Sequence, residues 1–319
     1  MMALPETPAR TRLAVVGAGA VGSTIAYAAM LRGIVHEIVL IDALAQKAEA
    51  EAKDLMHGSM FVASVDVRSG SLADCRDAAV VAITAGAKQK PGQTRLQLAE
   101  VNAGILRQMV PQILEAAPAA ILLIVSNPVD VLTHIALESS GLPAARVIGS
   151  GTVLDTSRFR SLLARRLNVA VGNVHAYIVG EHGDSEVPLW SSAQIAGTPL
   201  DQFVSPHAPP LTDPDRAEIF RNVREAAAQV IAAKGATNWA IGLAVARILE
   251  AILRDENAIL TVSSELNGYH GIRNVCLSVP SIVGRSGVRA TLPLRYSDAE
   301  MEALQRSAAI LRSAAGRLG

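Results

Sequence analysis

The residues with the clearest chemical potential surround a single histidine. His182 lies in residues 180–185, GEHGDS, directly after the apolar residues 176–179. Histidine can exchange a proton near neutrality because its ordinary pKa is about 6.5, and the flanking glycines permit turns or close contacts. The ring is therefore a candidate general acid or base, or it only caps a turn. Which of these two roles His182 has depends on its partners elsewhere in the chain.

Residues 151–160, GTVLDTSRFR, contain two such partners. Asp155 and Arg158 are three positions apart in a predicted helix, so they share one face. Asp155 can accept the Nδ1–H of His182 and favour the imidazolium. Arg158 can bind a carboxylate through two hydrogen bonds; the alternative is a plain surface ion pair. Arg160 lies about 200° around the helix from Arg158 and must face elsewhere.

A polar loop at residues 87–95 follows a predicted strand and contains Pro-Gly. Such a loop can close over a substrate. Arg95 could then polarise a carbonyl, and Gln89 could face the variable end of the substrate. The alternative is a solvated basic loop.

The elements that must position these groups begin with the apolar run 13–16 and a glycine motif, G-A-G-A-V-G. A helical pattern follows, and then a second apolar strand that ends on Asp42. In this context Gly17 makes a tight turn, Gly19 allows a pyrophosphate to approach, and Gly22 allows the helix to pack on the strand. The helix N-terminus binds the phosphates. Asp42 would hold ribose hydroxyls and repel a 2′-phosphate, which favours NAD over NADP; the alternative is a non-binding turn and a chance acid.

Apolar strands alternate with helical patterns through the first half of the chain, and this indicates a parallel sheet covered on both faces. Ligands bind at the carboxyl ends of such strands, where three loops fall, at residues 84–86, 126–128 and 149–151. Asn127 could bond a nicotinamide or a substrate there, or it only starts a turn before Pro128. The remaining predicted strands are 65–68, 78–83, 119–125 and 146–148, and the helices are 45–57, 96–117 and 129–140.

The second half predicts helices at 216–234 and 237–254, antiparallel strands at 258–266 and 275–283 around Asn267-Gly268, and an amphipathic helix at 298–318. We therefore predict an α/β protein. Residues 1–150 would form a Rossmann domain, a doubly wound parallel sheet that binds NAD. Residues 151–319 would form an α+β catalytic and substrate domain, and the two would share one cleft.

The bulk properties exclude several classes. Lys+Arg and Asp+Glu are balanced at 29 each and aromatics are 3%, so neither nucleic acid nor a membrane surface is an expected partner. Cys75 and Cys276 form no CxxC, which argues against disulfides or a structural metal site. The N-terminus lacks a signal-peptide pattern, and no run approaches the ~20 apolar residues of a membrane span. We expect a soluble cytoplasmic protein without a metal.

Six motifs that agree in order resemble NAD-dependent L-lactate dehydrogenases of the bacterial type, within the lactate/malate dehydrogenase superfamily, and the resemblance runs from about Arg12 to Leu318. They are the glycine motif, Asp42, residues 89–95, Ser126-Asn127-Pro128, residues 154–160 and residues 180–185. The resemblance implies that protonated His182 donates to the carbonyl of pyruvate as NADH delivers hydride, that Asp155 orients it and that Arg158 holds the carboxylate. Arg95 would stabilise the alkoxide, and Asn127 and Thr237 would line the substrate. The implied cofactor-binding residues are Gly17, Gly19, Val21, Gly22, Asp42, Thr84, Ala85, Gly86, Ser126 and Asn127.

Gln89 distinguishes lactate from malate dehydrogenases. Malate dehydrogenases of the superfamily place an arginine at this position, which pairs with the second carboxylate of oxaloacetate. Lys88 and Lys90 could partly compensate, so a malate or broader 2-hydroxy-acid dehydrogenase is the enzymatic alternative. A catalytically silent NAD-binding regulator would not need His182 and its partners.

Two further implications concern the assembly of the protein and the shape of its substrate pocket. Arg160 and His175 match a pair that binds fructose 1,6-bisphosphate, as an activator, across a subunit interface of allosteric homotetramers; the alternative is ordinary surface residues. Asn238-Trp239 departs from the tyrosine-like or apolar pair of many relatives, which puts the shape of the substrate pocket in doubt.

Overall fold

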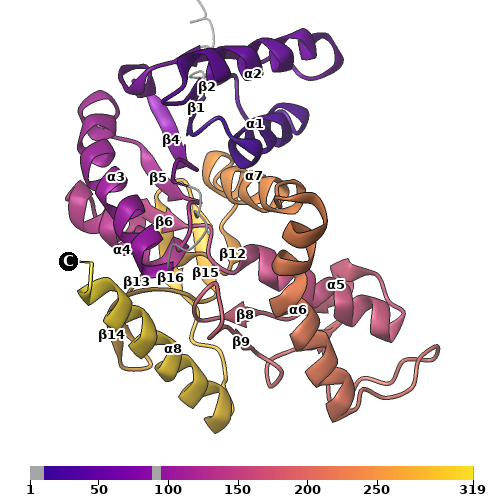
Figure 1. Cartoon of the computed structure of the whole chain (residues 1–319). Coiled ribbons are helices and arrows are strands. Elements are labelled where there is room, and N and C mark those ends of the chain that lie inside the picture. Colours follow the sequence, from indigo (N-terminus) through magenta and orange to yellow (C-terminus); the bar gives the residue numbers. More distant parts are fainter. Residues whose placement is uncertain (1–10, 88–94, 319) are drawn as a thin grey trace, which may run out of the picture.

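One continuous sheet runs through the molecule in the computed structural model, which describes residues 11–87 and 95–318, the side chains of residues 95 and 96 excepted (Figure 1). Six parallel strands have the order β3-β2-β1-β4-β5-β6, which is that of the doubly wound dinucleotide-binding fold. The predicted fold class is therefore confirmed. These strands are β1 (Arg12–Val16), β2 (Glu37–Ile41), β3 (Asp66–Gly70), β4 (Ala78–Ile83), β5 (Ile121–Ile124) and β6 (Val147–Gly149).

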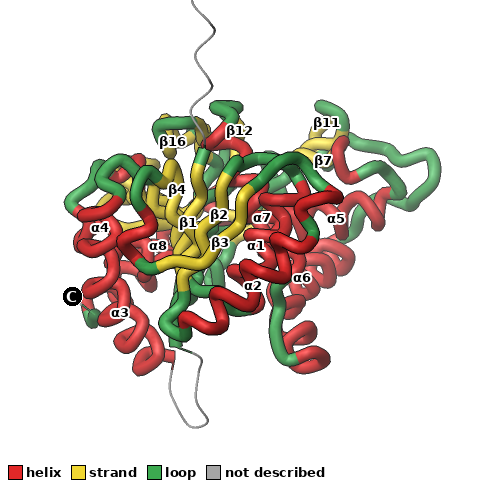
Figure 2. Tube along the Cα trace, turned by 90° about the horizontal axis from the view of Figure 1, so that it is seen from above, coloured by secondary structure: helices red, strands yellow, loops and turns green. Residues whose placement is uncertain are grey.

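Helices cover both faces of this sheet (Figure 2). One face carries α3 (Arg95–Ala116), α4 (Val129–Ser140) and α8 (Asp298–Gly316). The other carries α1 (Ala20–Leu31), α2 (Ala45–His57) and α7 (Trp239–Leu253). Along β1, Leu13 packs on the α1 face and Ala14 on the α3 face, because successive side chains of a strand point to opposite faces. The continuous apolar runs of the sequence follow from this double burial.

A second region packs around its own core and contains α5 (Val153–Leu167) and α6 (Asp213–Lys234). Phe159 of α5 is fully buried there, edge-on to the Trp190 ring with 4.8 Å between centroids. The α6 helix begins three residues before the predicted Arg216, because Thr212 and Asp215 form a capping box around its first turn. Five short strands in this region went unpredicted: β7 (Val174–His175), β8 (Ile178–Val179), β9 (Val187–Pro188), β10 (Gln194–Ile195) and β11 (Thr198–Pro199).

The antiparallel strands predicted around Asn267-Gly268 are confirmed only in part: residues 263–266 pair with residues 275–278, but each predicted strand is divided in two and the turn lies elsewhere. β13 (Ser263–Tyr269) pairs with β14 (Ile272–Ser278), and β15 (Ser281–Gly284) pairs with both β12 (Ala258–Leu260) and β16 (Gly287–Thr291). The tight turn falls at His270-Gly271, whose φ angles are 46° and 81°, as a two-residue hairpin loop requires. Asn267 marks a shift in strand register instead, as at a β-bulge.

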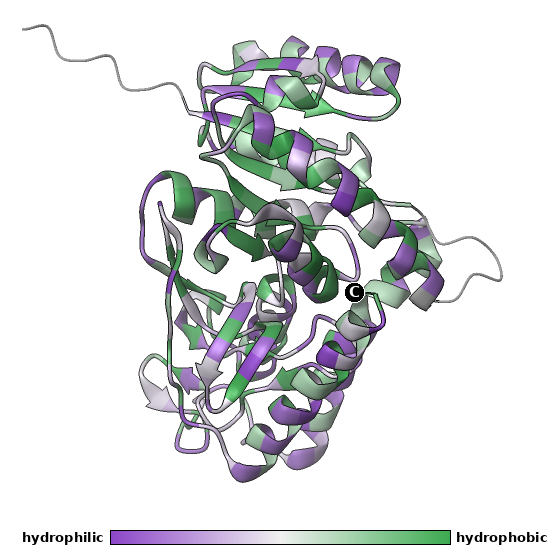
Figure 3. Cartoon of the chain, turned by 90° about the vertical axis from the view of Figure 1, so that its left-hand side faces the viewer, coloured by the Kyte–Doolittle hydropathy of each residue, from purple (hydrophilic) through white to green (hydrophobic). Residues whose placement is uncertain are grey.

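The β13–β14 hairpin joins the sheet of the first region, because Ser263 pairs with Gly149 of β6. The two regions therefore share a sheet, and the division at residue 150 stays a prediction. Hydrophobic residues, green in Figure 3, follow the strands inside the sheet, whereas the outer helices carry many hydrophilic residues, in purple. Among the described residues, no helix has both the length and the apolar character that crossing a membrane requires.

Candidate active site

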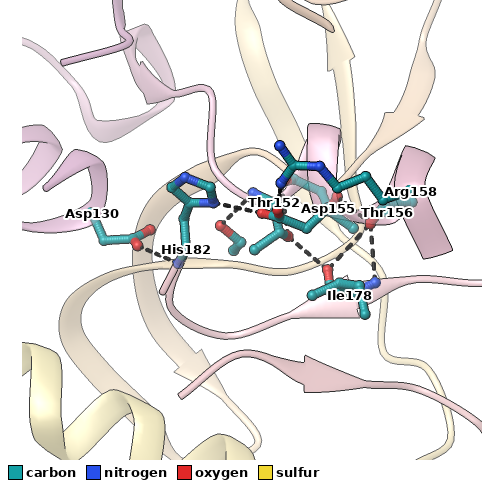
Figure 4. Close-up of polar contacts among 9 residues, drawn as sticks. Asp130, Thr152, Asp155, Thr156, Arg158, Ile178 and His182 are labelled. Carbon is teal, nitrogen blue, oxygen red and sulfur yellow. Dashed lines mark hydrogen bonds and ion pairs between the residues drawn. The ribbon is translucent and has the colours of Figure 1, made fainter. Parts of the chain in front are cut away.

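Asp155 lies between His182 and Arg158 and contacts both (Figure 4). Its Oδ2 atom is 2.5 Å from Nδ1 of His182, and its Oδ1 accepts a hydrogen bond of 2.7 Å from Nη1 of Arg158. The Asp155 side chain is only 3% exposed, against 27% for His182 and 18% for Arg158. The structure therefore brings together the acid, the base and the cation that the sequence singled out.

The charges of Asp155, His182 and Arg158 stabilise one another. Burial disfavours the imidazolium, but the negative charge of Asp155 and its hydrogen bond outweigh burial and raise the pKa of His182 to about 9. Burial would raise the pKa of Asp155, yet the positive charges of His182 and Arg158 lower it. His182 therefore carries its proton at neutral pH and can donate it.

The start of α5 is fixed against strand β8, and this places Asp155. Thr152 donates from Oγ1 to the carbonyl of Ile178 at 2.6 Å, and the Ile178 amide donates to Oγ1 of Thr156 at 3.0 Å. Thr152 also donates its amide to Oγ of Ser278 on β14. Because these bonds are buried, the first turn of α5 has little freedom to rotate, and Asp155 stays aimed at the histidine.

The histidine loop is held on its backbone side by a residue that the sequence analysis missed. Asp130, in the first turn of α4, accepts the His182 amide at Oδ2 at 2.7 Å. Burial raises the pKa of Asp130 to about 6. Gly180 has a φ of 91° and exchanges backbone hydrogen bonds with Ser278. The only signal in the sequence was a lone acid within the apolar residues 129–132.

A second overlooked acid is Glu186, which ends the histidine loop and is 7% exposed. Its Oε1 atom finds no hydrogen-bond partner among the described residues. Burial, and then the charge of Asp155, raises the pKa of Glu186 to about 8. The site thus contains a carboxyl that favours its protonated form at neutral pH, first because it is buried and then because the Asp155 carboxylate is close to it.

The glycine motif has the geometry of a nucleotide turn. Gly17 has a φ of 108°, and a Cβ on Gly22 would lie 1.8 Å from the Gly17 carbonyl oxygen. A Cβ on Gly19 would meet only Nζ of Lys47, at 3.8 Å, so this position is open. Asp42 accepts the Ala18 amide at 2.8 Å, which orients its carboxylate beside the turn. A tight turn, an open glycine and an oriented acid fit a dinucleotide.

The other predicted cofactor residues lie at adjoining strand ends. Thr84 donates to the Gly17 carbonyl at 2.8 Å, and Ser126 donates to the Ala85 carbonyl at 2.6 Å. Asn102 of α3, which is 3% exposed, ties two of these loops together: it accepts the amide of residue 87 at 2.8 Å and donates to the carbonyl of residue 127 at 3.0 Å. Sequence reasoning missed this residue, although it is polar on an otherwise apolar helix face. Val21, Gly86 and Asn127 border the same loops.

Several predicted site residues stay predictions. Gln89 lies outside the described residues, and Arg95 is placed only as the first residue of α3. Thr237 is half-buried in the connection between α6 and α7. Arg160 faces away from the histidine: its Nε donates to the Ala176 carbonyl at 2.8 Å.

Known proteins match this chain along most of its length. Residues 11–149 match the NAD binding domain, and residues 152–317 the alpha/beta C-terminal domain, of lactate/malate dehydrogenases. The chain is 50% identical to an L-lactate dehydrogenase of Bifidobacterium animalis subsp. lactis over 311 residues, 97% of each chain. It is also 50% identical to one of Thermus aquaticus over 308 residues, 97% of this chain and 99% of the relative.

A solved structure shows the same architecture. The minor L-lactate dehydrogenase of Enterococcus mundtii, in its ligands-bound form, superposes with a TM-score of 0.94 at 42% identity, covering 97% of this chain and 99% of that one. NAD is accordingly the cofactor of the first region. From its fold, its site and these relatives, the chain belongs to the lactate/malate dehydrogenase family.

Proposed function

We propose that this protein is an NAD-dependent L-lactate dehydrogenase (EC 1.1.1.27) that interconverts pyruvate and L-lactate in lactic fermentation. The observation that carries the proposal is the buried Asp155 carboxylate shared between His182 and Arg158. A proton donor and a carboxylate-binding cation side by side suit a 2-oxo acid. NAD, when bound, supplies the hydride acceptor or donor. Full-length relatives with this name support the choice of substrate.

The chain's own residues would handle the proton and the substrate. Protonated His182 donates from Nε2 to the carbonyl oxygen of pyruvate, and neutral His182 takes the proton back from L-lactate. Asp155 keeps the ring in this tautomer and stabilises its charge. Arg158 offers further guanidinium N–H groups, besides the one that Asp155 accepts, to the substrate carboxylate.

Two residues whose side chains lie outside the described part of the structure would complete the substrate site. Arg95 would stabilise the negative charge that develops on the carbonyl oxygen, and Gln89 would face the methyl end of pyruvate. Asn127 and Thr237 would border the substrate from the sheet edge and from the α6–α7 connection. The Gly17–Gly22 turn, Asp42 and the loops at residues 84–86 and 126–127 would hold the cofactor.

The deciding experiment follows the absorbance of NADH with pyruvate, oxaloacetate and a branched 2-oxo acid in parallel. We expect the highest kcat/KM for pyruvate. A higher value for oxaloacetate would assign the chain as a malate dehydrogenase, and a higher value for the branched acid would assign a broader 2-hydroxy-acid dehydrogenase. NADH binding without oxidation by any of the three would leave only an NAD-binding regulator.

Fructose 1,6-bisphosphate would act as an activator that binds Arg160 and His175 across a subunit interface. In support, the Arg160 guanidinium lies 4.9 Å over the Tyr177 ring, beside strand β7, where His175 is exposed. Two symmetric copies would bring four basic groups to two phosphates. We expect the sugar bisphosphate to lower the KM for pyruvate in the wild type and not in Arg160→Gln. An unchanged wild-type KM at mildly acidic and neutral pH would contradict the activator role.

A homotetramer is the assembly that we propose for this chain. In support, Met60 and Phe61 are 88% and 82% exposed, and Phe61 borders a pocket with Tyr27 and Leu31; apolar patches of this kind mark contact surfaces. Light scattering should give the mass of four chains, and Phe61→Asp should lower it. A monomer mass for the wild type would contradict the tetramer. Two buried free cysteines fit the proposed cytoplasmic location.

A further inference from the structure

The Asn238 side chain connects three helices. Asn238 occupies the N-cap position of α7, yet its side chain makes no capping hydrogen bond to that helix. Its Nδ2 donates to Oγ1 of Thr24 on α1 at 2.9 Å, and its Oδ1 accepts from Nζ of Lys234 on α6 at 2.8 Å. An asparagine at this position ordinarily accepts an amide of its own helix. Here the amide oxygen and the amide nitrogen each make a contact with another helix.

The direction of every hydrogen bond in this series is fixed. A lysine ammonium can only donate, so Oδ1 of Asn238 must face it and Nδ2 is left to donate to Thr24. The Thr24 hydroxyl then donates to the Ala20 carbonyl at 2.6 Å. The three bonds therefore run head to tail from Lys234 to Ala20, and bonds aligned in this way strengthen one another.

The series lies beside both halves of the site. One end, Ala20, is the first residue of α1 and follows Gly19 of the nucleotide turn directly. Asn238, within the series, is the chain neighbour of Thr237, the predicted wall of the substrate pocket. Close packing holds α1 against α7, because a Cβ on Gly242 of α7 would lie 2.4 Å from Cγ2 of Thr24.

The segment that carries Thr237 has little other support. Gly235, which ends α6, has a φ of 83° and is exposed, as is Ala236. Asn238 is half-buried and binds a side chain that is 6% exposed. The contact between Asn238 and Thr24 is therefore the part-buried anchor of this connection, beside the exposed bond that Asn238 accepts from Lys234.

We propose that Asn238 is a positioning residue that couples cofactor binding at α1 to substrate binding at Thr237. The proposal rests on the proposed function for the identity of the substrate. A cofactor that holds the first turn of α1 would hold Thr24, and through Asn238 the wall of the substrate pocket. By linkage the substrate must strengthen cofactor binding by the same factor.

The test measures this factor by calorimetry without turnover. NADH is titrated into the wild type, Asn238→Ala and Thr24→Val, with and without saturating oxamate, the unreactive amide isosteric with pyruvate. Oxamate should tighten NADH binding in the wild type, and this gain should fall by about 10-fold in each variant, the scale expected for the loss of a well-formed hydrogen bond. The KM for pyruvate should rise by a similar factor and kcat should change little.

A double variant identifies the contact that carries the coupling. Asn238→Ala and Thr24→Val together should cost no more than either alone, because both remove the same hydrogen bond. Lys234→Met should have a smaller effect, since the lysine is exposed. Gln229→Ala is the matched control: its amide bonds Glu225 within α6 and reaches no other helix by that bond.

Three results would overturn the proposal. They are a wild type in which oxamate leaves NADH binding unchanged, a lower Tm in Asn238→Ala with unaltered coupling, and additive effects of Asn238 and Thr24. Failure of the proposed function would give a different result, namely a wild type that does not oxidise NADH with pyruvate. In that case oxamate is replaced by an unreactive analogue of the acid that is turned over, and the same three results apply.

Discussion

The carboxylate of Asp155 lies 2.5 Å from the Nδ1 of His182 and is almost entirely removed from solvent. A buried charge pair of this kind holds a proton on the ring well above the ordinary pKa of histidine. The same carboxylate also accepts a hydrogen bond from Arg158, so one side chain aligns the imidazole and the guanidinium.

Asp155→Asn should remove most of the activity. The amide keeps the shape but not the charge, so the pKa of His182 should fall and kcat/KM for pyruvate should drop by about 10²- to 10⁴-fold at neutral pH. The matched control is Asp74→Asn, which breaks a partly exposed pair with Arg68 of 3.0 Å and should keep wild-type kinetics. Steady-state assays of both variants check this, and an active Asp155→Asn would contradict the orienting role.

The two directions of the reaction should respond oppositely to pH. Pyruvate reduction needs the protonated ring, so its kcat/KM should be level near neutrality and decline above the pKa of His182, about 9. Lactate oxidation needs the neutral ring and should rise through the same range. Rate profiles in both directions check this; a decline of pyruvate reduction centred near pH 6.5 would show that Asp155 does not hold the proton.

Glu186 should make the fold less stable as pH rises. Its folded pKa of about 8 lies above the ordinary value of 4.5, so the stabilisation is complete below 4.5 and is lost as pH rises through 8. His182 contributes with the same sign between 6.5 and about 9. Tm should therefore fall from pH 6 to 9, and less steeply in Glu186→Gln. The exposed Glu302→Gln should match the wild type; equal slopes in all three would contradict this role of Glu186.

The parallel sheet and the pair of Asp155 and Arg158 could be predicted from the sequence, because each depends on local pattern. His182 stood out by its residue type and its flanking glycines. Doubly buried strands read as apolar runs, and Asp155 and Arg158 share a helix face through their spacing. Asp130 and Asn102 could not be found in this way: each matters through one backbone group that the fold brings from 52 or 25 residues away. The Asn267-Gly268 signal failed because the register of β13 and β14 moved the turn to His270-Gly271.

Substitutions at two glycines of the nucleotide turn should distinguish an effect on NADH binding from an effect on stability. Gly22→Ala places a Cβ against the Gly17 carbonyl, so it should cost about 1–3 kcal/mol of stability, the usual range for overpacking, and weaken NADH binding. Gly19→Ala meets no close neighbour, so Tm should stay unchanged while the methyl group blocks the pyrophosphate. Thermal unfolding and NADH titration of both variants check this. Normal NADH affinity in Gly19→Ala would show that the phosphates lie elsewhere.

Asp130→Ala should slow the reaction without touching the imidazole. The His182 amide loses its charged acceptor, a bond of a class worth about 1.5–3 kcal/mol, and the position of the histidine loop is no longer fixed by that bond. We expect kcat to fall by at least about 10-fold, and Asp130→Asn, which retains an acceptor oxygen, to recover most of it. Similar losses in both variants would mean that the charge of Asp130, rather than its hydrogen bond, is what matters.

Gln89→Arg should turn the preference from pyruvate towards oxaloacetate. A second carboxylate facing a neutral glutamine would be desolvated without a partner, whereas arginine would give it a charged hydrogen bond worth about 1.5–3 kcal/mol. The ratio of kcat/KM for oxaloacetate to that for pyruvate should therefore rise by about 10- to 100-fold. Gln89→Met, which is similar in size and uncharged, controls for the substitution itself and should leave oxaloacetate poor. If the ratio stays at the wild-type value in Gln89→Arg, residue 89 does not face the variable end of the substrate, and the neighbouring Lys88 and Lys90 become the next positions to exchange.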